Sequence, residues 1–120
     1  MTAAAQAVAA RPLVDSHCHL DYLERDGDIE PVVARALDAG VGTLVTICTK
    51  LSEFDRIEAI AQRFPRVYCS VGVHPHEADK ECQETPDRLL ELAAHHMVVR
   101  IGETVLYYSY EQAPRAAQQV

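Results

Sequence analysis

The sequence lacks several features that would assign it to whole classes of protein. No stretch approaches the ~18 apolar residues that a membrane-spanning helix needs. No Gly-rich phosphate loop follows any of its apolar runs, which disfavours a nucleotide-binding doubly wound sheet. Only Lys50 and Lys80 are lysines, and 11 basic against 18 acidic residues give a net charge of −7. Because a protein that grips nucleic acid by its phosphates usually carries a basic surface, a passive DNA-binding module is disfavoured, and work on a polyanion would need a metal cation.

The cysteines lack the spacing of a metal or redox motif. No C-x-x-C pair occurs among them, so a zinc ribbon and a thioredoxin-like motif are excluded. Two of them lie inside apolar runs, where a thiol behaves as a small hydrophobe. We expect all four to be reduced, as is usual in a cytoplasmic protein: Cys18, Cys48, Cys69 and Cys82.

What is present is the composition of one globular domain. The chain has 120 residues, of which 48% are hydrophobic and 24% charged. Residues 1–11 are alanine-rich and lack the basic and strongly apolar regions of a signal peptide, so we expect a flexible tail before a domain over residues 12–120. We expect a cytoplasmic protein with no membrane partner. A complete (β/α)8 barrel needs about 250 residues, more than this sequence has.

Strand-like apolar runs alternate with amphipathic helical patterns along the chain. We expect strands at residues 13–14, 43–48, 67–73 and 98–102, and helices at residues 29–40, 52–64, 86–93 and 111–120. The units repeat at roughly 30 residues, which is the spacing of a βα barrel. The sequence therefore predicts an α/β fold, a (β/α) barrel of TIM type with about four of its eight βα units present.

Two histidines follow the first predicted strand. His17 and His19 are two residues apart, and a period of two places both imidazoles on the same side of an extended chain. Neutral imidazoles held in this way suit a divalent ion of the zinc or manganese class. The alternative is a surface turn in which two histidines occur by chance.

The third and fourth predicted strands also end in polar residues. His74 and His76 repeat the two-residue spacing, and Glu103 follows directly after Gly102. The histidines could instead bond to loop carbonyls, and Glu103 could either bridge two metals or cap a following helix. Because parallel βα sheets carry their chemistry at the carboxyl ends of the strands, we expect these side chains to share one site. The adjacent pair His95-His96, near the end of a helix, indicates a structural role.

Three segments resemble the TatD family of metal-dependent deoxyribonucleases. Val14-Asp15-Ser16-His17-Cys18-His19-Leu20-Asp21 is similar to the first motif of that family, Gly72-Val73-His74-Pro75-His76 to its second and Ile101-Gly102-Glu103-Thr104 to its third. Their order and separations also match, and the resemblance runs from about Leu13 to the last residue. It implies an amidohydrolase-like barrel of which this sequence holds the N-terminal half.

The resemblance also implies an activity and the residues that perform it. It implies a hydrolase that cleaves the phosphodiester bonds of DNA, with exonuclease action expected, using two divalent ions (Mg, Mn or Zn). His17 and His19 would bind the first metal, and Glu103 would bridge both ions as a metal ligand and catalytic carboxylate. His74 and His76 would bind substrate in the pocket.

The sequence departs from the family after Glu103-Thr104. The family usually continues with glycine, leucine, aspartate and tyrosine, whereas this chain has Val105 and Tyr107 where the glycine and the aspartate stand. Two other functions therefore stay open. One is a non-catalytic half-barrel that self-associates or binds a partner through its open edges. The other is a related barrel hydrolase that acts on a small ester, amide or lactone.

Overall fold

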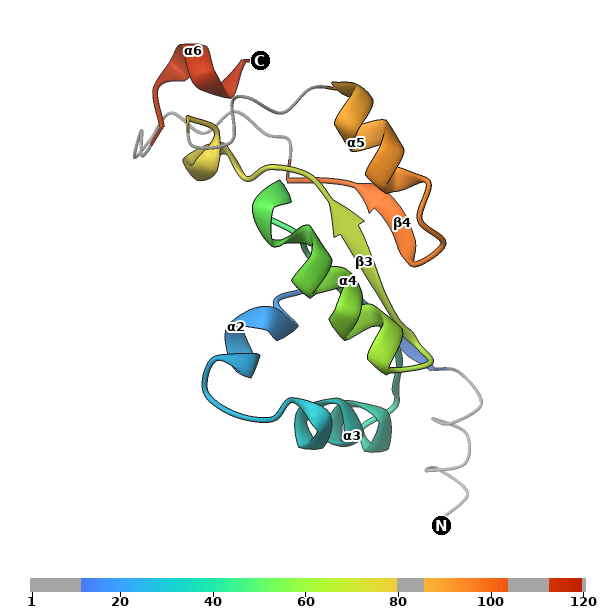
Figure 1. Cartoon of the computed structure of the whole chain (residues 1–120). Coiled ribbons are helices and arrows are strands. Elements are labelled where there is room, and N and C mark those ends of the chain that lie inside the picture. Colours follow the sequence, from blue (N-terminus) through green and yellow to red (C-terminus); the bar gives the residue numbers. More distant parts are fainter. Residues whose placement is uncertain (1–11, 80–85, 104–112, 120) are drawn as a thin grey trace.

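The protein is built on one parallel sheet. The computed structural model describes residues 12–79, 86–103 and 113–119. Its four strands are β1 (Leu13–Cys18), β2 (Val41–Thr46), β3 (Val67–Val71) and β4 (Val98–Ile101), hydrogen-bonded in the order β1-β2-β3-β4. Strands in sequence order with helices between them confirm the α/β prediction, and the sheet is that of a partial (β/α) barrel (Figure 1). The expected tail at residues 1–11 lies outside the described residues.

Helices lie between the strands and after the last of them. They are α2 (Leu20–Glu24), α3 (Glu30–Asp38), α4 (Phe54–Arg63), α5 (Pro86–Ala93) and α6 (Arg115–Gln118), with short 3₁₀ turns η1 (Leu51–Glu53) and η2 (Pro75–Glu77). α3 contacts β2, α4 contacts β3, and α5 contacts both β3 and β4. Within the described ranges, no helix combines the length and the apolarity that crossing a membrane requires.

The helix termini follow local chemistry. The Asp28 carboxylate accepts the backbone N–H of Glu30 at 3.1 Å, so it satisfies one of the free donors in the first turn of α3. Pro86 begins α5, as predicted, since a proline at the first position costs no helical hydrogen bond. The helix predicted over residues 52–64 begins two residues later than expected, at Phe54, because Ser52 lies inside η1. The short helix α2 was not predicted; five residues are too few to show a helical period.

The strand boundaries differ by a few residues from those predicted. β2 spans residues 41–46 rather than 43–48, because the chain already pairs with β1 at Val41. A Cβ on residue 42 would lie 2.6 Å from the Pro12 Cβ, so Gly42 permits this close start of the pairing. The last predicted helix is shorter than expected, spanning Arg115–Gln118 within the described residues 113–119.

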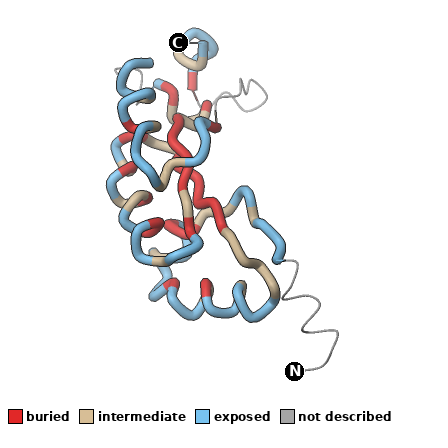
Figure 2. Tube along the Cα trace, turned by 90° about the vertical axis from the view of Figure 1, so that its right-hand side faces the viewer, coloured by how far each residue is buried: buried red, intermediate tan, exposed pale blue. Residues whose placement is uncertain are grey.

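The core lies between the sheet and the helices. The buried residues, red in Figure 2, gather on the central strands and recur at intervals along the helices. They are Leu20, Ile29, Val33, Leu44, Cys48, Leu51, Phe54, Ile57, Ile60, Ala61, Val67, Cys69, Val71 and Leu92. Cys18, Cys48 and Cys69 are free thiols, which confirms that prediction for three of the four cysteines, and Cys82 lies outside the described residues. Burial raises the pKa of Cys69 to about 12, so its thiol stays protonated at neutral pH.

Candidate functional site

The predicted site residues lie at the carboxyl ends of the strands. His17 is the next-to-last residue of β1, and His19 follows that strand as the residue before α2. His74 follows β3 and precedes η2, while Glu103 comes two residues after β4. Since all the strands are parallel, their carboxyl ends lie at the same end of the sheet.

The Glu103 carboxylate lies between two of these histidines. Its Oε1 atom is 3.3 Å from Nε2 of His17, and its Oε2 atom is 3.5 Å from Nε2 of His74. The Glu103 side chain is only 12% exposed. β1 and β4 occupy the two edges of the sheet, so this contact forms because the sheet curves until the ends of its outer strands approach each other.

His74 has a defined proton position. Its Nδ1 atom accepts the backbone N–H of His76 at 3.1 Å, so the neutral ring carries its proton on Nε2 and donates toward Glu103. Desolvation lowers the pKa of His74, and the charge of Glu103 opposes that shift only in part. His74 is therefore a neutral hydrogen-bond donor at neutral pH.

The backbone at Glu103 adopts a strained conformation. Its φ of +61° lies in the left-handed region, which residues other than glycine rarely adopt. Gly102, the residue before it, donates its N–H to the Val71 carbonyl at 3.0 Å. Gly72 allows the backbone at Gly102 to come close, because a Cβ added to residue 72 would lie 1.7 Å from the Gly102 carbonyl oxygen.

His19 lies beside His17 with one ring nitrogen enclosed. The two ring centroids are 5.2 Å apart, and His19 stacks on Tyr22 at 4.6 Å. The Nδ1 atom of His19 is buried, and no residue in the described ranges forms a hydrogen bond with it. Among the residues that the structure describes, no three histidine, cysteine, aspartate or glutamate side chains form a group that could hold a metal ion. The assignment of His17, His19 and Glu103 as metal ligands stays a prediction.

The second histidine pair forms a compact unit. The rings of His74 and His76 pack edge to face with centroids 4.5 Å apart, and Pro75 between them begins η2. The backbone N–H of His74 donates to the Thr49 carbonyl at 2.9 Å, which ties the loop after β3 to the segment after β2. The structure thus places His74 beside Glu103 and His76 against His74, and the role of the pair in binding substrate stays a prediction.

The sequence alone assigned no role to two residues near the site. Asp21 is 2% exposed, its Oδ1 atom has no hydrogen-bond partner among the described residues, and burial raises the pKa of its carboxyl. Arg100 on β4 donates from Nη1 to the Ser16 carbonyl on β1 at 3.4 Å. A charged residue inside the apolar run of a predicted strand was the signal that could have identified Arg100.

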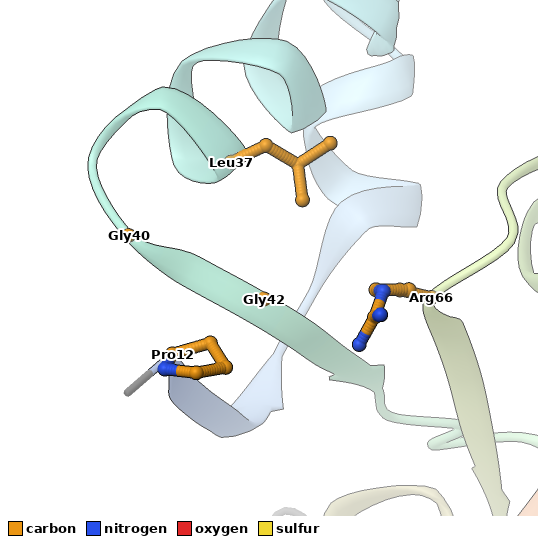
Figure 3. A pocket seen from close by; sticks show the side chains of 5 residues that line it. All are labelled: Pro12, Leu37, Gly40, Gly42 and Arg66. Carbon is orange, nitrogen blue, oxygen red and sulfur yellow. The ribbon is translucent and has the colours of Figure 1, made fainter. Parts of the chain in front are cut away.

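Two other features lie apart from the site. His95 contacts the Glu58 carboxylate and packs edge to face with the Phe54 ring, which confirms its structural role. A hollow of about 220 Å³ opens at the other end of the sheet, where β2 begins (Figure 3). It is lined by Pro12, Leu37, Gly40, Gly42 and Arg66, without a histidine or a carboxylate.

Comparison with known proteins identifies a family of hydrolases that this chain resembles over most of its length. The model of the family described as "TatD related DNase" matches residues 14–120. The chain is 38% identical over 82 residues to the 3'-5' ssDNA/RNA exonuclease TatD of Shigella flexneri serotype 5b. It is 31% identical over 106 residues to YabD of Bacillus subtilis, described as an uncharacterized metal-dependent hydrolase. The match covers 68% of this chain in the first case and 88% in the second.

A solved structure supports the fold. The crystal structure of YjjV from Escherichia coli K12, a TatD homologue, matches with a TM-score of 0.65 and 30% identity over 89% of this chain. The matched part is 42% of the YjjV chain, 42% of YabD and 32% of the Shigella enzyme. The match thus spans between 32% and 42% of the length of these relatives.

Proposed function

Because the chain belongs to the family of TatD-related DNases, we propose that it acts as a metal-dependent hydrolase on the phosphodiester bonds of DNA, as an exonuclease. The observation that carries this proposal is the Glu103 carboxylate held between the His17 and His74 rings at the strand ends. The name of the Shigella relative, an exonuclease of single-stranded DNA and RNA, supports nucleic acid as the substrate.

The distance between two of the donor atoms fits ligands of one divalent ion. Two ligands about 2.0 Å from a tetrahedral ion lie about 3.3 Å from each other, which is the distance between His17 Nε2 and Glu103 Oε1. His19, whose ring touches that of His17, is the third ligand that we propose. A second ion would need ligands beyond these residues.

The histidines of the pocket act as donors in this proposal. His74 holds its proton on Nε2, so it can donate to a phosphate oxygen without becoming charged. His76 packs against it and would contact the same substrate. Bound divalent ions would stabilise the charge that develops on the phosphate and lower the pKa of an attacking water. They would also supply the positive charge that a chain with a net charge of −7 lacks.

The test is a double substitution, His17→Ala with His19→Ala, assayed for cleavage of DNA with and without Mn²⁺. We expect metal-dependent cleavage to be abolished and the affinity for Mn²⁺ measured by calorimetry to fall by at least tenfold. His96→Ala is the matched control, because His96 is an exposed residue in the turn after α5. Cleavage that survives the double substitution unchanged would refute the proposal.

The outer strands favour a second function, association with another copy of the chain. Leu13 and Val14 on β1 are 63% and 62% exposed, and Val99 and Ile101 on β4 are 53% and 46% exposed. Open strand edges with exposed apolar side chains readily pair with another chain. Sedimentation equilibrium tests this proposal, and a monomer at all concentrations would contradict it.

A further inference from the structure

A β-bulge sets the direction of the Arg100 side chain. Val98 pairs with Cys69 and Arg100 pairs with Ser70, so β4 carries one extra residue between two consecutive residues of β3. Cys69 packs in the core on the helix side of the sheet, and its neighbour Ser70 therefore points to the opposite face. Because paired residues share a face, the bulge turns Arg100 to the side away from the helices.

The Arg100 guanidinium lies next to the candidate site. Its Nη1 atom donates to the carbonyl of Ser16, the residue before His17, at 3.4 Å. Directly after β4, the strand of Arg100 itself, a Cβ on Gly102 would lie 3.1 Å from Nε of Arg100, and Glu103 is the next residue. The guanidinium thus lies between Ser16 and Gly102, the residues that directly precede His17 and Glu103.

Most of the donors of this guanidinium have no partner among the described residues. An arginine side chain carries five N–H groups, and among the described residues Arg100 uses one of them, in a long hydrogen bond. No described carboxylate lies within ion-pair distance of it, whereas Arg56 pairs with Glu24 at 3.2 Å and Arg63 with Asp28 at 2.7 Å. A planar fork of free donors is the arrangement that binds phosphate oxygens in pairs.

We propose that Arg100 is a substrate-binding residue that holds a phosphate group of a nucleic-acid strand beside the Glu103 carboxylate. This inference rests on the proposed function, since it takes the phosphodiester as the substrate. It differs from a purely structural role, in which Arg100 only ties β4 to the Ser16 carbonyl. A structural clamp would affect stability but not the dependence of binding on salt.

The experiment measures binding of a fluorescein-labelled oligothymidylate by anisotropy over a series of salt concentrations, with Ca²⁺ and separately with chelator. We expect Arg100→Gln to weaken binding about tenfold, the loss of a charged hydrogen-bonding group, and to reduce the salt slope by about 0.7. Arg100→Lys should keep the salt slope and lose part of the affinity, because it keeps the charge without the fork. Arg66→Gln is the control, since Arg66 lies in the hollow at the other end of the sheet (Figure 3).

The outcomes separate this inference from the proposed function. Wild-type binding no tighter than that of Arg100→Gln, or an equal loss in Arg66→Gln, would overturn the role of Arg100. A loss of melting temperature in Arg100→Gln with unchanged affinity and salt slope would also overturn it in favour of the clamp. If the wild type binds through Arg100 but does not cleave DNA with Mn²⁺, the phosphate site stands and the hydrolase proposal fails. If the wild type cleaves DNA and Arg100→Gln leaves KM and the salt slope unchanged, the hydrolase proposal stands and the phosphate site at Arg100 fails.

Discussion

The Cα atom of Gly72 faces the carbonyl oxygen of Gly102 so closely that a Cβ on residue 72 would lie 1.7 Å from that oxygen. This contact joins the end of β3 to the end of β4, one residue before Glu103, and Gly102 also donates its N–H to Val71. The position of the Glu103 carboxylate therefore depends on a residue that carries no side chain.

The first prediction concerns this backbone contact. Gly72→Ala would force the ends of β3 and β4 apart, and we expect it to lower the free energy of unfolding by about 1–3 kcal/mol, measured in urea. Gly102→Ala is the matched control, because the three atoms nearest to its added Cβ all belong to the flexible Arg100 side chain, of which Nε would lie 3.1 Å away. Equal losses in the two variants would show that the close approach at Gly72 is not what matters.

The second prediction concerns the left-handed backbone at Glu103, whose φ is +61°. We expect Glu103→Gly to be more stable than Glu103→Ala by about 1 kcal/mol, because only glycine adopts a positive φ without strain. The comparison uses two variants that both lose the carboxylate, so the lost contacts to histidine cancel. At Ala59, an exposed position in α4, the order should reverse, and Ala59→Gly should lose about 1 kcal/mol. Alanine equal to glycine at position 103 would contradict the strained backbone.

The third prediction concerns the side of α5 that packs on the sheet. Leu92 is 3% exposed and belongs to the core, whereas Leu90 on the same helix is 62% exposed. We expect Leu92→Ala to cost about 2–5 kcal/mol, through lost burial and the cavity left behind. Leu90→Ala should change stability by less than about 0.5 kcal/mol. Urea unfolding of the two variants measures this difference, and a larger loss at Leu90 would mean that α5 is turned the other way.

The fourth prediction concerns the pH dependence of stability at the start of α3. The backbone N–H of Glu30, and then the Arg63 side chain, lower the pKa of Asp28 below its ordinary value of 3.8. A carboxyl whose pKa is lower in the folded state adds stability above the unfolded pKa, and this stability is lost as the pH falls through the folded pKa. The difference in free energy of unfolding between the wild type and Asp28→Ala should therefore be greatest above pH 3.8 and decrease as the pH falls below that value.

Asp28→Asn provides the control for that prediction. Asparagine keeps an oxygen that accepts the Glu30 N–H but does not titrate. Thermal melts over a series of pH values should thus show a gap between Asp28→Asn and Asp28→Ala that does not change with pH. If the difference in stability between the wild type and Asp28→Ala stays constant down to the lowest pH, the lowered pKa of Asp28 is not its cause.

Local sequence signals were sufficient for most of the fold. The apolar stripe that predicts α3 also predicts which side of it faces the sheet, and Pro86 marks the start of α5 because proline suits that position alone in a helix. The signals failed for α2, which has no cap and too few residues for a period. They also failed for the start of β2, because hydrogen bonds to another strand decide where pairing begins.

The sequence by itself determined the residue types of the candidate site and the strand ends that carry them, because apolar runs, turn residues and motif spacing are local properties. Only the tertiary structure decided that the His17 and Glu103 side chains meet, since this depends on how far the sheet curves between its two outer strands. It also decided which face Arg100 occupies, because one bulged residue in β4 reverses the alternation that the sequence pattern assumes. Curvature and register are properties of paired strands, so no single strand encodes them.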